Sequence, residues 1–323
     1  MLYQFRLALY RFTLRPREEM ILPVYKGAVL RGGFGYIFKR TVCFQPQTTS
    51  CRGCILRYDC PFPALFEPSP PPDAEVLRKN QNIPLPFVIE PPLDRRTRYE
   101  PGETLSFRLV LIGQAIARLA YFVVAFQQLG EVGIGPRRAK YTLERVEALQ
   151  PWNWEAVTLY EDGALVRSAG EMIMDYGMVA ERAAALEADG VDTITVKFLT
   201  PTRLKHLGHY ATQPDFHVLV RALLRRVSSL SYFHCGERWE TDYRGIIEAA
   251  KRVRLAQART EWVDWERYSC RQRQRMKLGG LVGQATYEGE LGPFLSLLVL
   301  GELVHVGKAC VFGHGKYEIA DND

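Results

Sequence analysis

The two halves of this 323-residue chain finish with the same pattern, and that repeat restricts the fold more than any other feature. In the middle, an apolar run at residues 115–129 leads into GEVGIGPRRAKY at 130–141. Further on, an apolar run at 293–304 leads into HVGKACVFGHGKY at 305–317. Each reads as a helix, a glycine loop with basic residues, and a strand that starts at a tyrosine. We name residues 130–140 the first glycine loop and 305–316 the second. An internal duplication predicts two domains of one design.

The order of predicted elements supports that duplication. The first half predicts a strand at 3–14, a helix at 24–40, strands near 87–90 and 104–112, a helix at 115–129 and a strand to about 148. The second half predicts a strand at 193–199, a helix at 216–233, a hairpin of 273–278 with 281–287 turning at Gly279 and Gly280, a helix at 293–304 and a last strand. Both spell βαββαβ, so we expect an α+β protein of two tandem ferredoxin-like domains, at 1–150 and 191–323. RNA-recognition domains use the same order.

Charge divides the chain in a similar way. Residues 147–192 hold ten acidic and two basic side chains, although the whole chain carries a net charge of +6. We therefore read 151–190 as an acidic connector between two basic bodies, with a solvated surface helix as the alternative. No apolar run approaches the roughly 20 residues that span a bilayer, and the first residues lack a signal-peptide pattern. We expect a cytoplasmic protein.

Residues 43–92 interrupt the first domain as an insertion rich in cysteine and proline. Four of the seven cysteines of the chain, Cys43, Cys51, Cys54 and Cys60, lie within 18 residues. The C-x-x-C pair lets two thiolates meet one metal ion, and the other two thiols can complete a tetrahedron. We expect a structural zinc ion that orders the insertion. An iron–sulfur cluster and metal-free thiols are the alternatives.

Basic residues predict that the protein binds RNA. Glycines let backbone amides approach a phosphate, and both glycine loops carry cations. The candidate contacts there are Arg137, Arg138, Lys140, Lys308, Gly313, His314, Gly315 and Lys316. Arg271, Arg273, Arg275 and Lys277 alternate, so a strand would align them on one face about 6.6–6.8 Å apart, close to the phosphate spacing of an extended RNA. Trp262, Trp265 and Tyr268 precede them; we expect the tryptophans to anchor the core, with base stacking as the alternative.

Four stretches of the chain resemble the RAMP superfamily, specifically its CRISPR-associated precursor-RNA processing endoribonucleases. They are LRGGFG at 30–35 with Cys43, the cysteine segment to Pro61, TPTRLK at 200–205, and MKLGG at 276–280 together with the second glycine loop. This resemblance implies two ferredoxin-like domains that bind CRISPR repeat RNA. It implies cleavage without a catalytic cofactor, in which the upstream 2′-hydroxyl attacks the phosphate and leaves a 2′,3′-cyclic phosphate and a 5′-hydroxyl. Other CRISPR effector subunits are further expected partners.

The resemblance also directs attention to the first helix, where many relatives hold a catalytic tyrosine, histidine or lysine. Tyr25, Tyr36 and Lys39 are the catalytic candidates there, and Arg31 is a candidate RNA contact. This chain departs from those relatives because its first histidine is His206. If histidine supplies the base, it must be one of the six histidines in the second half, and His234 and His305 are the candidates.

Two rival functions remain at this point. A RAMP-type RNA-binding subunit would keep the fold and the basic surface but would not cut RNA. A metabolic enzyme with a phosphate-bearing cofactor is the weaker rival, because both glycine loops follow helices and neither joins a strand to a helix.

Overall fold

The computed structural model describes residues 2–48, 50–70, 83–167, 172–188, 191–264, 266–269 and 274–320, with the backbone alone at 266–269 and 274–277. The chain divides into two compact units. The N-terminal unit comprises Phe5–Met174 and Phe233–Gly236, and the C-terminal unit comprises Met1–Gln4, Asp175–Tyr232 and Glu237–Asp323. β9 (Met174–Asp175) and the π-helical turn η3 (Ser231–Cys235) lie where the chain passes from one unit to the other.

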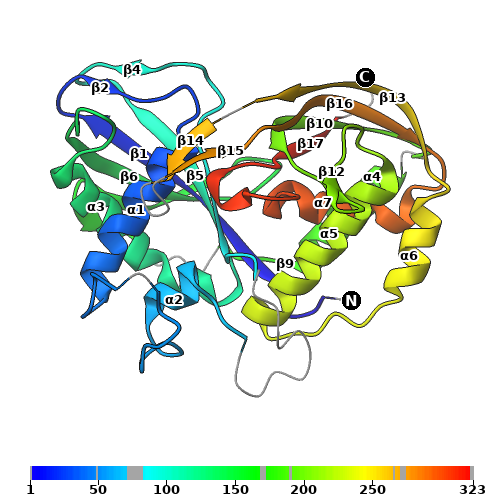
Figure 1. The fold of residues 1–323 in the computed structure, drawn as a ribbon, viewed down its shortest axis with the longest axis horizontal. Coiled ribbons are helices and arrows are strands. Elements are labelled where there is room, and N and C mark those ends of the chain that lie inside the picture. The colour runs from blue at the N-terminus through cyan, green and yellow to red at the C-terminus, as the bar shows by residue number, and fades with distance from the viewer. Residues whose placement is uncertain are drawn as a thin grey trace. The chain divides into compact units, whose positions relative to one another are not determined.

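The N-terminal unit contains a ferredoxin-like sheet with an extension at one edge. Its elements are β1 (Arg6–Pro16), β2 (Met20–Ile21), α1 (Gly27–Val42), α2 (Pro61–Phe66), β3 (Phe87–Glu90), β4 (Arg98–Tyr99), β5 (Leu105–Ile112), η1 (Gly113–Arg118), α3 (Leu119–Val132), β6 (Tyr141–Leu149), β7 (Ala156–Glu161) and β8 (Ala164–Leu165). The main sheet runs β3-β5-β1-β6-β7-β8 with antiparallel neighbours. The strands β3-β5-β1-β6 have the ferredoxin-like order. α1 packs against α3 (Figure 1).

Aromatic side chains form the core of this unit. Phe34 on α1 stacks on Phe122 and Phe126 of α3, with ring centroids 4.3 Å and 5.6 Å apart. Phe12 on β1 stacks on Phe107 of β5 at 5.2 Å. Stacked and tilted aromatic pairs contribute about 0.5–1.5 kcal/mol each beyond the area they bury. The cluster therefore fixes both helices on the sheet.

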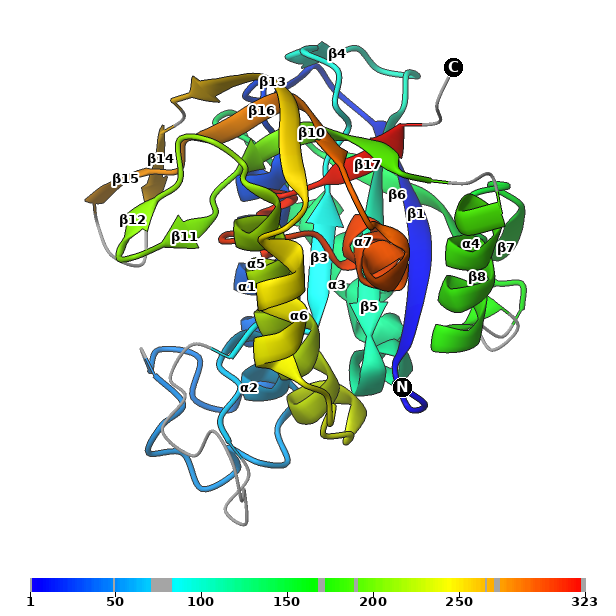
Figure 2. The same cartoon turned by 90° about the vertical axis from the view of Figure 1, so that its right-hand side faces the viewer.

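The C-terminal unit repeats this design. Its elements are α4 (Tyr176–Ala188), β10 (Thr193–Thr202), β11 (Lys205–His206), β12 (His209–Tyr210), α5 (Phe216–Leu230), α6 (Tyr243–Ala250), β13 (Arg254–Val263), β14 (Glu266–Ser269), β15 (Gln274–Lys277), β16 (Gly280–Glu288), η4 (Gly292–Phe294), α7 (Leu295–Val304), η5 (Cys310–Phe312) and β17 (Tyr317–Ala320). Its sheet runs β13-β16-β10-β17, again antiparallel and in the ferredoxin-like order. α7 packs against α4 and α5, and α5 packs against α6 (Figure 2). The predicted fold class is confirmed.

Two buried tyrosines show how closely the halves correspond. The hydroxyl of Tyr141, at the start of β6, donates to the carbonyl of Phe126 on α3 at 2.8 Å. The hydroxyl of Tyr317, at the start of β17, donates to the carbonyl of Leu298 on α7 at 2.6 Å. Each tyrosine also lies against a glycine of that helix: a Cβ on Gly130 would lie 2.3 Å from the Tyr141 carbonyl oxygen, and one on Gly301 would lie 2.1 Å from the Tyr317 hydroxyl. The repeated sequence thus encodes a repeated contact.

The expected hairpin of 273–278 with 281–287 is wrong. β15 pairs with β14, whereas β16 pairs with β13 and β10. The β13–β16 pair and the β14–β15 pair follow one another along one long two-stranded ribbon (Figure 2). Gly279 lies between β15 and β16, and Gly280 is the first residue of β16, so the chain continues along one side of this ribbon. A Cβ on Gly279 would lie 2.8 Å from the Val263 carbonyl oxygen, and one on Gly280 would lie 2.7 Å from the Thr202 amide nitrogen. These glycines mark close contact between strands, and they do not form a turn.

Residues 151–190, expected to be an acidic connector, contain regular structure in both units. β7 pairs with β6 at the edge of the N-terminal sheet, and α4 packs against α7 in the C-terminal unit. In the proline-rich stretch, 61–66 forms α2, and Phe66 packs against Phe34 and Phe38 with centroids 5.4 Å and 6.0 Å apart. Residues 71–82 of that stretch lie outside the described part of the chain.

Candidate nucleic-acid interface

Hydrogen bonds hold the second glycine loop against the end of β10. The Thr200 hydroxyl donates to the carbonyl of Gly313 at 2.8 Å and accepts from the backbone amide of Lys316 at 2.9 Å. A Cβ on Gly307 would lie 2.4 Å from the carbonyl oxygen of Arg203. Only glycine allows this approach, and its φ of +85° also suits glycine. The loop and the Thr-Pro-Thr-Arg segment therefore form one structure.

Four cations gather where that loop meets the segment after β10: Arg203, Lys205, Arg225 and Lys308. We call them the cation cluster. Partial burial, and then the charges of Arg225, Lys205 and Arg203, lower the pKa of Lys308. Among the described residues, no ion pair includes any member of the cluster. Like charges held together without counter-charges favour a bound anion such as phosphate.

The first glycine loop has a different electrostatic environment. A guanidinium nitrogen of Arg137 lies 2.8 Å from a carboxylate oxygen of Glu19. The backbone amide of Lys140 donates to a carboxylate oxygen of Glu18 at 2.7 Å. Arg138 is exposed and has a φ of +52°. Two carboxylates thus lie where we expected phosphates to bind.

The predicted contacts at the end of the second glycine loop need correction. The side chains of His314 and Lys316 are buried, with 0% and 6% exposure, and Gly313 and Gly315 are buried too. These residues form the interior of the loop, because the loop folds over β10 and turns them inward. Exposed Lys308 is the member of this set that can reach a ligand from the surface.

The alternating arginines on the ribbon are only partly described. Arg271 and Arg273 lie outside the described residues, and for Arg275 and Lys277 the structure gives the backbone alone. That backbone is a strand, in which Arg275 pairs with Tyr268 and Lys277 with Glu266. RNA contact by this face stays a prediction.

On the first helix, Tyr36 is the most accessible catalytic candidate. Its ring is 56% exposed, and its hydroxyl accepts a hydrogen bond from Arg40, one turn along α1, at 3.2 Å. The neighbouring Arg40 guanidinium carries positive charge that attracts a phosphate. The Lys39 ammonium instead donates to the carbonyl of Thr48. Arg31, the predicted RNA contact, lies over the ring of Phe66 at 4.7 Å.

Both candidate catalytic histidines are buried. His305 has 0% exposure, and its Nδ1 lies 2.9 Å from the carbonyl oxygen of His314, which closes the second glycine loop. His234 has 6% exposure, and its Nε2 lies 2.7 Å from the carbonyl oxygen of Pro84. Imidazoles held by backbone carbonyls inside the protein support loop structure more readily than proton transfer to RNA.

Comparisons with known proteins agree with this arrangement. Residues 5–171 match the family model AF_1859_N, described as an N-terminal domain. Residues 196–317, which include the second glycine loop, match the model of the CRISPR-associated endoribonuclease Cas6. The chain belongs to the AF_1859_N family, and its residues 196–317, which we call the Cas6-like region, resemble the Cas6 endoribonuclease. The resemblance to CRISPR-associated RNA-processing endoribonucleases is thereby confirmed. An uncharacterized protein of Archaeoglobus fulgidus is 25% identical over 307 residues, covering 92% of each chain.

Solved structures share the fold. A Cas6 product complex has a TM-score of 0.58 at 17% identity, covering 97% of this chain and 99% of that one. Cas6 of Thermus thermophilus has a TM-score of 0.54 at 16% identity, covering 98% and 99%. A partial Cas6-RT-Cas1–Cas2 complex has a TM-score of 0.60 at 14% identity and covers 99% of this chain, which spans 47% of that longer chain. In the described part of this chain, no helix is both long and apolar enough to span a membrane.

The Cas6-like region also contains a pair of histidines that is not among the predicted site residues. The rings of His206 on β11 and His217 on α5 lie 5.3 Å apart and nearly perpendicular. Burial, and then the charges of His206, Lys251 and Arg221, lower the pKa of His217. Residues 207 and 208, Leu-Gly, turn the chain between β11 and β12. That turn signal could have indicated the hairpin, but only the fold brings α5 beside it.

The four clustered cysteines lie at the ends of two helices and in the turn between them. Cys43 follows α1, Cys60 precedes α2, and the backbone amide of Cys54 donates to the carbonyl of Cys51 at 3.1 Å. Cys43 and Cys60 lie close enough to act electrostatically on Cys51. Within the described ranges, however, no three cysteine, histidine or carboxylate side chains are placed to hold a metal ion. The zinc site stays a prediction.

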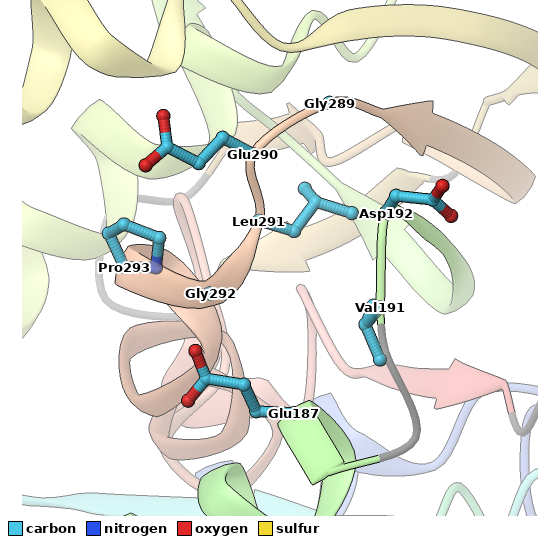
Figure 3. Close-up of a pocket in the computed structure, with 8 residues that line it drawn as sticks. All are labelled: Glu187, Val191, Asp192, Gly289, Glu290, Leu291, Gly292 and Pro293. Carbon is cyan, nitrogen blue, oxygen red and sulfur yellow. The ribbon is translucent and has the colours of Figure 1, made fainter.

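One cavity of the C-terminal unit is unsuited to RNA. It has a volume of about 690 Å³ and is lined by residues of α4 and of the segments next to β10 and η4 (Figure 3). Its charged side chains are all acidic: Glu187, Asp192 and Glu290. Carboxylates repel phosphates, so we look for the RNA site at the cation cluster instead.

Proposed function

We propose that this protein cleaves CRISPR precursor RNA within its repeats, by attack of the 2′-hydroxyl on the adjacent phosphate, to give guide RNAs. The observation that carries the proposal is the Cas6 endoribonuclease match, because it covers the second glycine loop and the whole cation cluster. The products would be a 2′,3′-cyclic phosphate and a 5′-hydroxyl. Since the nucleophile belongs to the RNA, the reaction needs no metal-bound water.

The cation cluster supplies what this chemistry requires at the phosphate. Attack by the 2′-hydroxyl produces a phosphorane with extra negative charge, and nearby cations stabilise it more than they stabilise the ground state. The lowered pKa of Lys308 also makes its ammonium a stronger acid for the departing 5′-oxygen. Alternatively, the chemistry lies on the N-terminal unit, where Tyr36 beside Arg40 is our candidate for the proton acceptor.

A second function has one observation in its favour. His234 and His305 are both buried and held by backbone carbonyls, so a non-cleaving RNA-binding subunit that keeps the Cas6 fold is the rival proposal. In either role we propose that the protein binds CRISPR repeat RNA and works with other CRISPR effector subunits.

The test is incubation of the purified protein with RNA containing its own repeat, in excess EDTA. We expect one cut per repeat, with products that carry a 2′,3′-cyclic phosphate. A single 2′-deoxy substitution before the cut should abolish cleavage. Cleavage of that deoxy substrate would overturn the mechanism, and binding of the normal repeat without cleavage would favour the rival.

A further inference from the structure

An arginine, a tyrosine and a tryptophan lie in a row beside the cation cluster. The guanidinium carbon of Arg203 lies 4.2 Å from the ring centroid of Tyr210 on β12. The ring of Tyr210 in turn lies 6.3 Å from that of Trp262 on β13, tilted by 41°. The fold therefore brings Arg203, the β12 residue Tyr210 and the β13 residue Trp262 together. We call Tyr210 and Trp262 the aromatic platform.

The aromatic platform is not part of the core. Tyr210 and Trp262 are each 40% exposed, which corrects the expectation that Trp262 anchors the core. The indole N–H of Trp262 donates to Asp264 at 3.2 Å, which fixes the ring plane at the surface. Arg203 stacked on one side holds Tyr210 in place. An exposed pair of large, oriented rings favours binding of another flat group.

Positive charge adjoins the aromatic platform. Lys205 pairs with Tyr210 across the β11–β12 hairpin. Arg203, which stacks on the platform, also belongs to the cation cluster, and its backbone lies against Gly307 of the second glycine loop. Among the described residues, the Nε of Arg203 has no hydrogen-bond partner, but this atom is buried, so a phosphate would have to reach the other guanidinium nitrogens. Flat apolar faces beside unpaired cations match the two chemical parts of a nucleotide, its base and its phosphate.

We propose that the aromatic platform stacks the bases of an unpaired stretch of RNA, while Arg203 and Lys205 bind its phosphates. The proposal rests on the function proposed above in one respect, that the unpaired stretch belongs to repeat RNA. Only unpaired bases present open faces to a side chain, since bases in a helix are already stacked. Each stacked base contributes about 1–3 kcal/mol and with little dependence on sequence. The platform therefore selects unpaired RNA and does not read its sequence.

The test uses an oligouridylate of about ten nucleotides, which cannot form a hairpin, and measures its affinity for the full chain. Trp262→Ala and Tyr210→Ala should each weaken binding by about fivefold to a hundredfold, as loss of one stacked base predicts. Trp262→Phe and Tyr210→Phe keep a ring and should bind almost normally. Tyr3→Ala is the matched control, because Tyr3 is an exposed aromatic residue of the same unit, 67% exposed.

Tryptophan fluorescence supplies a second readout. Oligouridylate should quench the emission of the wild type, and most of that quenching should be lost in Trp262→Phe, although the RNA still binds. Normal affinity in both alanine variants, or quenching unchanged in Trp262→Phe, would overturn the proposal.

The platform and the proposed function can fail separately. Repeat RNA that is cut normally by the wild type and by both alanine variants, with unchanged oligouridylate binding, would sink the platform and leave the endoribonuclease intact. Oligouridylate binding that needs both rings, in a protein that never cuts its repeat, would keep the platform and remove the cleavage.

Discussion

The two glycine loops share a scaffold but differ in their electrostatics. Both follow a helix whose carbonyl accepts from a buried tyrosine at the start of the next strand. At the first loop, Glu18 and Glu19 bind a backbone amide and a guanidinium. At the second, Lys308 lies among three other cations, and burial together with their charges lowers its pKa. A duplication thus preserved the contacts that build the fold, while the charges around each copy diverged.

This difference teaches that a motif alone does not locate an anion site. Glycines permit close approach of a phosphate at either loop, but a carboxylate already there must be displaced first. From the sequence alone, the two loops are equally good candidates for an anion site. The charges around them in the fold favour the second loop. The predictions below test whether that contrast between the halves is real.

The largest expected effect separates chemistry in the N-terminal unit from chemistry in the C-terminal unit. Tyr36→Phe removes one hydroxyl and should lower the single-turnover cleavage rate by about 10²-fold with little change in RNA binding. Lys39→Ala should have a similar effect only if its ammonium leaves Thr48 when RNA binds. Tyr121→Phe is the matched control, since Tyr121 is another exposed tyrosine of the same unit, 42% exposed.

Variants of the two buried histidines, His234 and His305, test the alternative that the chemistry depends on a histidine. His305→Ala and His234→Ala should lower the melting temperature and leave the rate per folded molecule unchanged. A 10²-fold loss of rate in either variant at normal stability would instead place the chemistry on that histidine and remove Tyr36 from the mechanism.

The next effect concerns binding at the two loops. Lys205→Ala with Lys308→Ala should weaken repeat-RNA binding by about tenfold or more and reduce the slope of affinity against salt by about two counter-ions. Arg137→Ala with Lys140→Ala removes the same charge from the first loop and should change affinity less than about threefold. Equal losses in the two double variants would show that Glu18 and Glu19 do not block the first loop.

The same contrast shows what the sequence could and could not predict. Periodicity predicted both βαββαβ units, because α5 buries one clear face and β1 alternates between buried and more exposed residues from Tyr10 to Pro16. It did not identify β13, whose side chains are exposed or half-exposed along its length, so no apolar alternation marks the strand. Without β13 as a partner for β16, Gly279 and Gly280 were read as a hairpin turn.

The candidate site was predictable only in part, for a related reason. Lys308 was selected because it lies within a motif. Arg203, Lys205 and Arg225 were not selected as RNA contacts, because three different segments must fold before they meet. The burial of His305 and His314 likewise depends on how the loop folds over β10, which local sequence does not indicate.

A third test addresses the cysteine segment, which only the first half possesses. We expect one zinc ion per chain by elemental analysis, or iron with visible absorbance. Cys54→Ser should release the metal and lower the melting temperature, since a structural metal contributes directly to folding. Cys235→Ser is the control, because Cys235 lies outside the cluster. Metal-free protein with four titratable thiols at 43, 51, 54 and 60 would refute the site.

The smallest effect concerns the glutamate that follows each helix glycine, Glu131 and Glu302. Glu131 is exposed and pairs with Arg17 at 2.9 Å. Glu302 accepts from the backbone amide of Ile319 at 2.6 Å, and burial raises its pKa to about 7. A carboxyl whose pKa is raised on folding holds its proton in the folded state, so its stabilising contribution is complete below about pH 4 and is lost as the pH rises through 7.

Glu302→Gln should remove this pH dependence, because the amide oxygen can still accept from Ile319 but has no charge to bury. Between about pH 5 and 8, the free energy of unfolding of the wild type should fall by on the order of 2 kcal/mol relative to that variant. Glu131→Gln is the matched control and should give a curve parallel to that of the wild type. Urea unfolding at several pH values measures all three. If Glu302→Gln also runs parallel to the wild type, the two glutamates are equivalent, and the halves differ in their loops alone.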